Sequence, residues 1–223
     1  MPLANPLTTD MINAAGNIHK QLDGWQATDK AIVKLRESLP GFDLNNVLLK
    51  ATVVNSLYST NVYAITRAAD HVYSVIKRNG HKKAGAGFVE EISRVPDVKT
   101  KSGKDRKFTS FASKFAHFFI DQGRFPIYDT YAVSAIKYHL GRGKWEKNTD
   151  DRPYEEFVQN FIELREISGY KGSTRNLDYY LWLAGLFLAW NKNKDAKINQ
   201  EVKVFFGNVD KQELIQQAFK GRF

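Results

Sequence analysis

The sequence predicts an all-α protein. Apolar residues recur at three- and four-residue intervals along most of the chain, strand-like alternation is scarce, and glycine or proline breaks separate the periodic segments. The chain has 223 residues and is 43% hydrophobic, enough for one substantial core or two helical lobes. We expect residues 1–223 to form a single helical unit with two interleaved lobes, one of residues 45–140 and the other of residues 1–44 with 141–223.

Ten helices are expected from this periodicity. In chain order they span residues 9–23, 27–38, 43–60, 61–78, 86–94, 108–121, 129–140, 152–168, 175–190 and 210–219. The segment 175–190 is apolar nearly all round, which predicts a position at the centre of a lobe. The short run from Val202 to Phe206 is interpreted as β-type or irregular structure, because it stops at Gly207.

The expected helix 108–121 carries a lysine in a polar stripe. Its apolar face has Phe108, Phe111, Ala112, Phe115 and Phe119 at helical spacing, and the opposite side has Ser110, Lys114, His117 and Asp121. A solvated helix face is the ordinary explanation of such a stripe.

Asp129 ends a short apolar segment and precedes the next expected helix. Pro126 favours an extended Phe125, so the segment returns toward the helix that carries Lys114. Aspartate is a common N-cap, and capping explains Asp129 on periodicity alone. The alternative is catalysis, since apolar surroundings raise a carboxyl pKa and lower an amine pKa, as a nucleophilic lysine requires.

Composition limits the function classes. The net charge of +9 indicates a polyanionic partner, although ribosomal or membrane-surface binding would give the same charge. No cysteine occurs, which excludes disulfides, thiolate metal sites and cysteine nucleophiles, and the five histidines lack metal-ligand spacing. We expect no metal and no cofactor. Neither a Gly-x-Ser-x-Gly motif nor a dinucleotide-binding motif is present.

The chain shows no targeting or membrane signal. Residues 1–10 lack a basic region followed by an apolar core, and no apolar run is long enough to cross a bilayer. We expect a soluble cytoplasmic monomer that does not bind membranes.

Three segments together resemble the helix-hairpin-helix DNA glycosylases, nearest the 8-oxoguanine glycosylase branch. Lys114 with the segment from Phe125 to Asp129 resembles their lysine, helix and aspartate segment. Leu48–Thr60 resembles an early helix whose polar end inserts into the duplex, and Arg175–Trp182 resembles a C-terminal helix of divergent members. The resemblance covers roughly residues 45 to 190.

The resemblance implies two lobes flanking a DNA-binding cleft and base excision from double-stranded DNA that carries a damaged or modified base. Lys114 would add to C1′ and form a Schiff base, while Asp129 would assist the attack and stabilise the oxocarbenium-like sugar. Cleavage of the strand at the abasic sugar would follow. Asn55, Tyr58 and Asn61 are the expected insertion residues.

The chain departs from the family in two respects. The glycine-rich hairpin before the lysine is missing, and the spacing from lysine to aspartate is shorter. Lys107 is an alternative amine. Without the hairpin another element must bind phosphate, and we expect the cationic loop before the helix to do so together with two residues of the helix: Lys99, Lys101, Lys104, Arg106, Lys107, Ser110 and His117. A flexible, solvated loop is the simpler explanation.

Weaker candidates for nucleic-acid contact lie elsewhere. A second basic group comprises His81, Lys82 and Lys83 in a glycine-rich turn. Three tryptophans near expected helix ends or loops could meet a base: Trp25, Trp145 and Trp190.

Other classes of function remain open. The same residues suit a non-catalytic helical module that binds DNA or RNA, a defence protein acting on modified phage DNA, or a protein-interaction subunit. The enzyme requires the Lys114 amine and the Asp129 carboxylate to converge on a cavity that holds a nucleotide, whereas a binding module requires only a basic surface.

Overall fold

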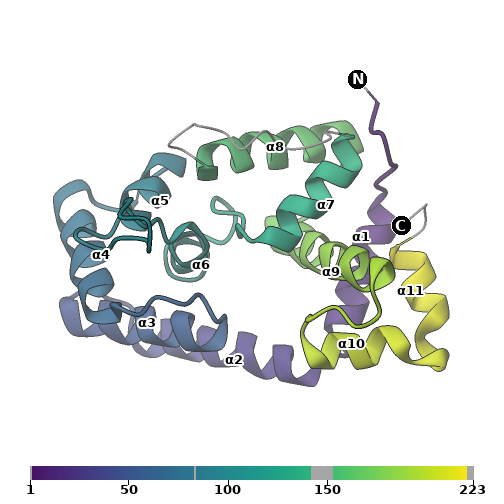
Figure 1. Cartoon of the computed structure of the whole chain (residues 1–223), viewed down its shortest axis with the longest axis horizontal. Coiled ribbons are helices and arrows are strands. Elements are labelled where there is room, and N and C mark those ends of the chain that lie inside the picture. Colours follow the sequence, from purple (N-terminus) through teal and green to yellow (C-terminus); the bar gives the residue numbers. More distant parts are fainter. Residues whose placement is uncertain (1, 83, 142–152, 220–223) are drawn as a thin grey trace. The chain divides into compact units, whose positions relative to one another are not determined.

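The computed structural model describes residues 2–82, 84–141 and 153–219. These residues form helices and connecting loops, and their only β-type pairing is an isolated bridge between Lys99 and Asp105 (Figure 1). The prediction of an all-α fold is confirmed. No helix in these ranges combines the length and the apolar character needed to span a membrane.

The helices follow one another with short connections. In chain order they are α1 (Thr9–His19), α2 (Asp23–Ser38), α3 (Leu44–Leu57), α4 (Ile65–Asn79), α5 (Ala86–Ser93), α6 (Thr109–Phe119), α7 (Thr130–Leu140), α8 (Pro153–Ser168), α9 (Thr174–Lys192), α10 (Gln200–Gly207), the 3-10 turn η1 (Val209–Lys211) and α11 (Gln212–Ala218).

Helix α10 corrects the interpretation of the run after residue 200. Val202, Phe205 and Phe206 are buried together on one side of it, at helical spacing. The Asn199 side chain accepts a hydrogen bond from the Val202 N–H and so caps the helix. The interpretation as β-type or irregular structure was wrong because Val and Phe suit strands by propensity, while burial and the cap favour a helix here.

The chain divides into two compact units. Unit 1 comprises Met1–Ala27, Asp129–Thr149 and Gln159–Phe223, and unit 2 comprises Thr28–Tyr128 with Asp150–Val158. Both α2 and α8 contribute residues to each unit.

Unit 1 is organised around α9, which packs against α1 and α7. Most of its residues from Thr174 to Leu186 are buried, as expected for the centre of a lobe. The α7 and α9 backbones approach closely where Gly185 faces Tyr131. A Cβ atom built on Gly185 would lie 2.5 Å from the carbonyl carbon of Tyr131 and 2.6 Å from its Cα.

A buried histidine links the amino-terminal segment to α7 in unit 1. The Nδ1 atom of His139 lies 2.9 Å from the Asn5 carbonyl oxygen, and its Nε2 atom lies 2.9 Å from the Tyr180 hydroxyl. A carbonyl oxygen only accepts, so Nδ1 carries the proton and Nε2 accepts from Tyr180. Burial lowers the pKa of His139, an effect that the Asn5 carbonyl partly opposes, and raises the pKa of Tyr180.

In unit 2, α3 packs against α4 and α6, and α5 packs against α4 and α6. The buried Glu90 of α5 caps the start of α8, where its Oε1 accepts from the backbone N–H of Tyr154 at 2.5 Å and of Glu155 at 3.3 Å. Burial raises the pKa of Glu90, and the two backbone N–H groups partly oppose that rise.

Candidate functional site

Helix α6 holds Lys114 in the interior of unit 2. The lysine is only 5% exposed, and its neighbours Ser113 and His117 are fully buried. The interpretation of this polar stripe as a solvated helix face was therefore wrong. Periodicity identified the apolar face of α6 correctly, but it could not show that another segment covers the polar face.

The covering segment is the extended run from Phe125 to Tyr128. The Tyr128 N–H donates to Ser113 Oγ at 3.1 Å, and His117 Nδ1 donates to the Phe125 carbonyl oxygen at 2.7 Å. The Nζ of Lys114 donates to Ser110 Oγ at 2.7 Å and lies 3.5 Å from the Tyr128 carbonyl oxygen. The structure thus brings Ser110, Lys114 and the Tyr128 carbonyl together.

Two of these contacts bear on the expected DNA-binding residues. The fully buried His117 ring has its Nδ1 committed to a backbone carbonyl, so the predicted phosphate contact of His117 is not available. Ser110 is half-buried and its Oγ accepts a hydrogen bond from the Lys114 amine, a role that differs from binding phosphate directly.

Asp129 belongs to unit 1, where it is the N-cap of α7. Its backbone is extended (φ −151°, ψ 170°), and its Oδ1 accepts from the Ala132 N–H at 2.7 Å. The capping interpretation is confirmed. Capping occupies one carboxylate oxygen, and the negative charge at a helix N-terminus is stabilised by the helix dipole. The carbonyl that Lys114 approaches belongs to the peptide bond joining Tyr128 to Asp129.

The three expected insertion residues at the end of α3 differ in their hydrogen bonds and in their exposure to solvent. The Oδ1 of Asn55 accepts from the Thr60 hydroxyl and the Val62 N–H, at 2.8 and 2.9 Å, while its Nδ2 donates to the Val62 carbonyl. The Tyr58 hydroxyl donates to an Asp29 carboxylate oxygen at 3.2 Å.

Asn55 and Tyr58 therefore hold the loop in place, and the prediction that they insert into DNA does not agree with these contacts. Tyr58 also packs its ring 5.0 Å from that of Phe118. Asn61 alone among the three expected residues is exposed, at a positive φ of 56°.

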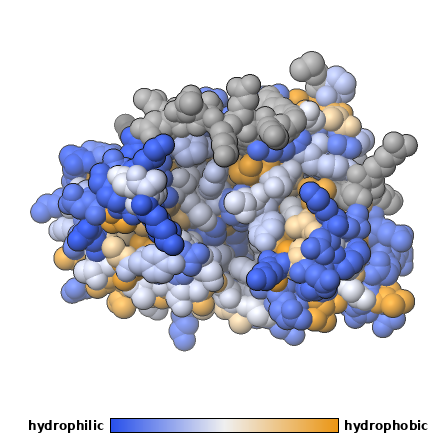
Figure 2. All heavy atoms as spheres, viewed as in Figure 1, coloured by the Kyte–Doolittle hydropathy of each residue, from blue (hydrophilic) through white to orange (hydrophobic). Residues whose placement is uncertain are grey.

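The cationic loop between α5 and α6 is folded into a narrow turn. Thr100 N–H donates to the Lys104 carbonyl at 2.7 Å, Arg106 N–H donates to the Val98 carbonyl at 2.8 Å, and Lys99 forms an ion pair with Asp105. Three of its lysines, Lys99, Lys101 and Lys104, are exposed, while Arg106 and Lys107 are half-buried. Figure 2 shows hydrophilic side chains gathered over the region where Figure 1 places this loop.

A second buried lysine in unit 2 escaped the sequence analysis. Lys50 of α3 is 1% exposed, and its Nζ donates to the Gly41 carbonyl at 2.6 Å and lies 4.2 Å from the centre of the Phe42 ring. Burial lowers the pKa of Lys50, with a smaller opposing effect from Asp43. Its position on the buried side of α3, one turn from both Val47 and Val54, was the available sequence signal.

The weaker candidates are placed as follows. Trp25 packs against Trp182, with ring centres 4.5 Å apart, and Trp190 packs against Phe187 and Phe206. Burial lowers the pKa of His81, and the charges of Lys82 and Lys50 lower it further. Lys83 and Trp145 lie outside the described residues.

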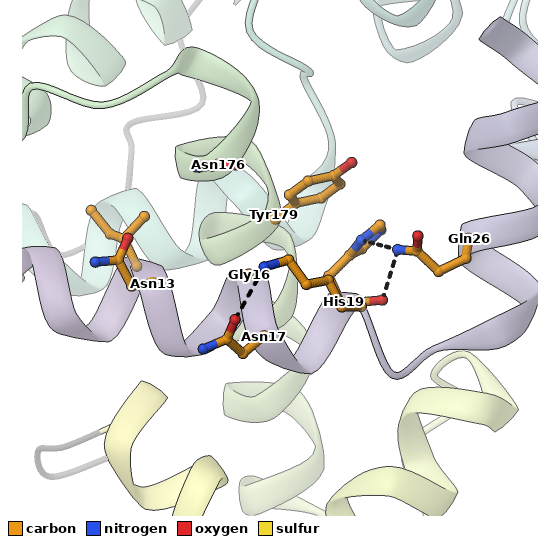
Figure 3. A pocket seen from close by; sticks show the side chains of 9 residues that line it. Asn13, Gly16, Asn17, His19, Gln26, Asn176 and Tyr179 are labelled. Atoms are coloured by element: carbon orange, nitrogen blue, oxygen red, sulfur yellow. Dashed lines mark hydrogen bonds between the residues drawn. The ribbon is translucent and has the colours of Figure 1, made fainter.

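Unit 1 contains a polar pocket of about 420 Å³ beside α1 and α9 (Figure 3). Its polar lining includes Asn13, Asn17, His19, Lys20, Gln26 and Asn176. Gln26 Nε2 donates to the carbonyl of His19 and to its Nδ1, while the Tyr179 ring stacks on the imidazole at 3.7 Å. None of the expected catalytic or DNA-binding residues lines this pocket.

Comparison with known proteins identifies the family. A family model named HI_0787_N and described as an N-terminal domain matches residues 11–122, which is half of the chain. The chain therefore belongs to this family. The matched region contains α6 with Lys114 and the cationic loop, and it ends before Asp129.

One curated relative extends the comparison beyond the matched domain. The chain is 30% identical over 141 residues to a protein of Haemophilus influenzae (strain ATCC 51907 / DSM 11121 / KW20 / Rd) named "Uncharacterized protein". The aligned region covers 62% of this chain and 66% of that protein, slightly less than two thirds of its length. No solved structure matches the chain.

Proposed function

We propose that the protein is a DNA glycosylase that removes a damaged or modified base from double-stranded DNA and cleaves the resulting abasic site through a lysine Schiff base. One observation carries this proposal: the Lys114 amine is held in the interior, beside the carbonyl of the peptide bond that leads into Asp129. The proposed enzyme acts as a cytoplasmic monomer, and oxidised guanine and modified phage bases are its candidate targets.

The proposed chemistry assigns one role to each residue. The unprotonated Lys114 amine attacks C1′ of the target nucleotide as the N-glycosidic bond breaks, and the departing base takes the bonding electrons and then a proton. Asp129 accepts the proton that the amine loses and stabilises positive charge on the sugar. Opening of the sugar ring gives the Schiff base, from which elimination of the 3′ phosphate cleaves the strand.

The Lys114 amine is buried and held in one position. An amine can attack only in its unprotonated form. The rings of Phe111 and Phe115 are fully buried in the same helix, and Ser110 Oγ positions the Nζ atom. The cationic loop immediately before α6 supplies exposed lysines that can bind phosphate.

A base-release assay tests the proposal. Duplex oligonucleotides carrying 8-oxoguanine, or a modified base such as those of phage DNA, are incubated with the intact protein and with Lys114→Gln, Asp129→Asn and Lys50→Gln. Asparagine is as good an N-cap as aspartate, so Asp129→Asn removes the charge and keeps the helix cap. Lys50→Gln is the matched control, because it removes a second buried lysine of unit 2.

We expect release by the intact protein and by Lys50→Gln, and a large loss in the other two variants. Unchanged release in Lys114→Gln or Asp129→Asn would refute the assigned roles.

A non-catalytic DNA-binding module is the second candidate. The observation that favours it is that Lys114 and Asp129 both have structural partners, namely Ser110 and the start of α7. In that case the intact protein would bind DNA and release no base from any of the duplexes.

A further inference from the structure

The loop between α3 and α4 presents Tyr63 to solvent. Its side chain is 82% exposed, although the preceding residue, Val62, is buried. A single exposed apolar side chain is ordinary on a protein surface and needs no functional explanation. Tyr63, however, lies where its own loop meets the cationic loop between α5 and α6.

The loop is rigidly built. The three hydrogen bonds of Asn55 fix Thr60 and Val62, so that Tyr63 projects from a held backbone. The described residues contain three non-glycine residues at positive φ: Ser59 (47°), Asn61 (56°) and Asp97 (58°). A positive φ is uncommon outside glycine, although Asn and Asp adopt it more readily than other residues, and surrounding contacts hold the backbone in that conformation.

All three positions lie in the two loops that meet near Tyr63. Ser59 and Asn61 precede it in its own loop, and Asp97 opens the cationic loop. Arg67, in the first turn of α4, donates from Nη1 to the Asp97 carbonyl at 3.2 Å and so joins the two loops.

Arg106 provides the second contact between the loops. Its guanidinium lies 5.4 Å from the centre of the Tyr63 ring and 5.0 Å from that of Phe108. A cation beside an aromatic ring can hold the ring in position through a cation–π contact, and it can also attract an anionic group that approaches the ring. The cationic loop adds Lys101 and Lys104, which are exposed, and Lys99, which is exposed and paired with Asp105.

The surface therefore combines an exposed aromatic ring, a guanidinium beside that ring and the exposed lysines of the cationic loop, all within unit 2. A nucleic acid strand offers the complementary groups, namely a flat base and regularly spaced phosphates. An acidic peptide would satisfy the lysines and leave Tyr63 without a planar partner.

We propose that Tyr63 and Arg106 form a stacking platform for an unpaired base of DNA, and that the lysines of the cationic loop bind the phosphates next to that base. This inference rests on the proposed function, in that it takes DNA as the partner and names the residues that receive it. An enzyme that acts on one base must remove it from the duplex stack, and the unpaired nucleotides created in this way need a surface that holds them.

Binding measurements test the platform. Fluorescence anisotropy is recorded with a labelled single-stranded oligonucleotide and with a fully paired duplex of the same sequence, for the intact protein, Tyr63→Ala, Tyr63→Phe and Lys101→Gln/Lys104→Gln. Val209→Ala is the control, since Val209 is also 82% exposed but belongs to unit 1.

The proposal expects Tyr63→Ala to weaken single-strand binding by roughly tenfold or more, the usual effect of removing an aromatic ring that stacks on a base. Tyr63→Phe keeps the ring and should retain affinity, and Val209→Ala should leave it unchanged. The double lysine variant should weaken binding to both DNAs and reduce the dependence of affinity on salt.

Equal affinity of Tyr63→Ala and the intact protein for the single strand would overturn the platform, and so would equal losses in Tyr63→Phe and Tyr63→Ala. Preferential binding of a labelled polyglutamate peptide over both DNAs would overturn the choice of partner. The base-release assay separates this outcome from that of the proposed function. If the protein needs Tyr63 to bind DNA but releases no base, the platform stands and the glycosylase assignment is refuted. If the protein releases a base and Tyr63→Ala binds DNA as well as the intact protein does, the platform is refuted and the glycosylase assignment stands.

Discussion

Replacement of Gly185 by alanine tests the packing at the centre of unit 1. The residue lies inside α9, where its backbone meets that of Tyr131 in α7. The new Cβ would fall 2.5 Å from the Tyr131 carbonyl carbon and 2.6 Å from its Cα. Ordinary carbon contacts are about 3.5–4.0 Å, so α7 and α9 must separate locally by about 1 Å. Both partners are backbone atoms, and no side-chain rotation can relieve the overlap.

Two opposing contributions set the change in the free energy of unfolding that Gly185→Ala causes. Overpacking of a filled core costs about 1–3 kcal/mol, while alanine gains about 0.5–1 kcal/mol over glycine inside a helix. We expect Gly185→Ala to lower the free energy of unfolding by roughly 1–2 kcal/mol. In a chain of this size, that loss corresponds to a fall in Tm of about 2–8 °C.

Gly16→Ala is the matched control, because Gly16 lies inside α1 of the same unit and a Cβ there meets nothing within 4 Å. It keeps only the helical gain, so we expect it to raise Tm by about 1–4 °C. Thermal unfolding followed by circular dichroism at 222 nm measures both variants. Equal or higher stability of Gly185→Ala relative to the intact protein would refute the close packing of α7 on α9.

Three further predictions concern polar groups. Asp129→Ala should lower the free energy of unfolding by about 1 kcal/mol in urea titrations, and Asp129→Asn should not, because only alanine removes the α7 cap. Burial lowers the pKa of His139 in the folded state, so its contribution to stability should be present above the ordinary value of 6.5 and decline as pH falls below that value. Urea titrations at pH 7.5 and 5.5 should therefore show a smaller difference in the free energy of unfolding between the intact protein and His139→Gln at the lower pH. Burial raises the pKa of Glu90, so the stability of the intact protein relative to Glu90→Gln should be greatest below the ordinary value of 4.5 and fall as pH rises through the folded pKa. Urea titrations between pH 4 and 7 measure this difference, and a rise in it with pH would contradict the raised pKa.

The helices were predictable because their apolar periodicity is strong. The segment around α6 shows it plainly, since Phe111 and Phe115 fall where spacing places the core. Helix α10 was missed because short runs of Val and Phe are ambiguous between strand and helix. The helical spacing of its three buried residues, together with Asn199 before them, was the signal that would have corrected the interpretation.

The candidate site was less accessible to sequence reasoning, because tertiary contacts decide what a polar side chain does. Sequence spacing predicts that the polar stripe on α6 is solvated, whereas in the structure the extended segment 125–128 covers Lys114. Asn55 is a polar residue of a type that usually lies at the surface, yet its side chain hydrogen-bonds the backbone of its own loop. The exposure of Tyr63 is equally invisible in the sequence, because local spacing does not reveal which aromatic rings the core leaves outside.

The most direct test of the glycosylase proposal is identification of the amine that reacts with DNA. The intact protein is incubated with a duplex carrying an abasic site in the presence of borohydride, which reduces a Schiff base to a stable adduct, and the linked peptide is located by mass spectrometry after proteolysis. The proposal predicts a single adduct on Lys114 that Lys50→Gln retains and Lys114→Gln loses. No adduct, or an adduct located on Lys50 or Lys107, would contradict it.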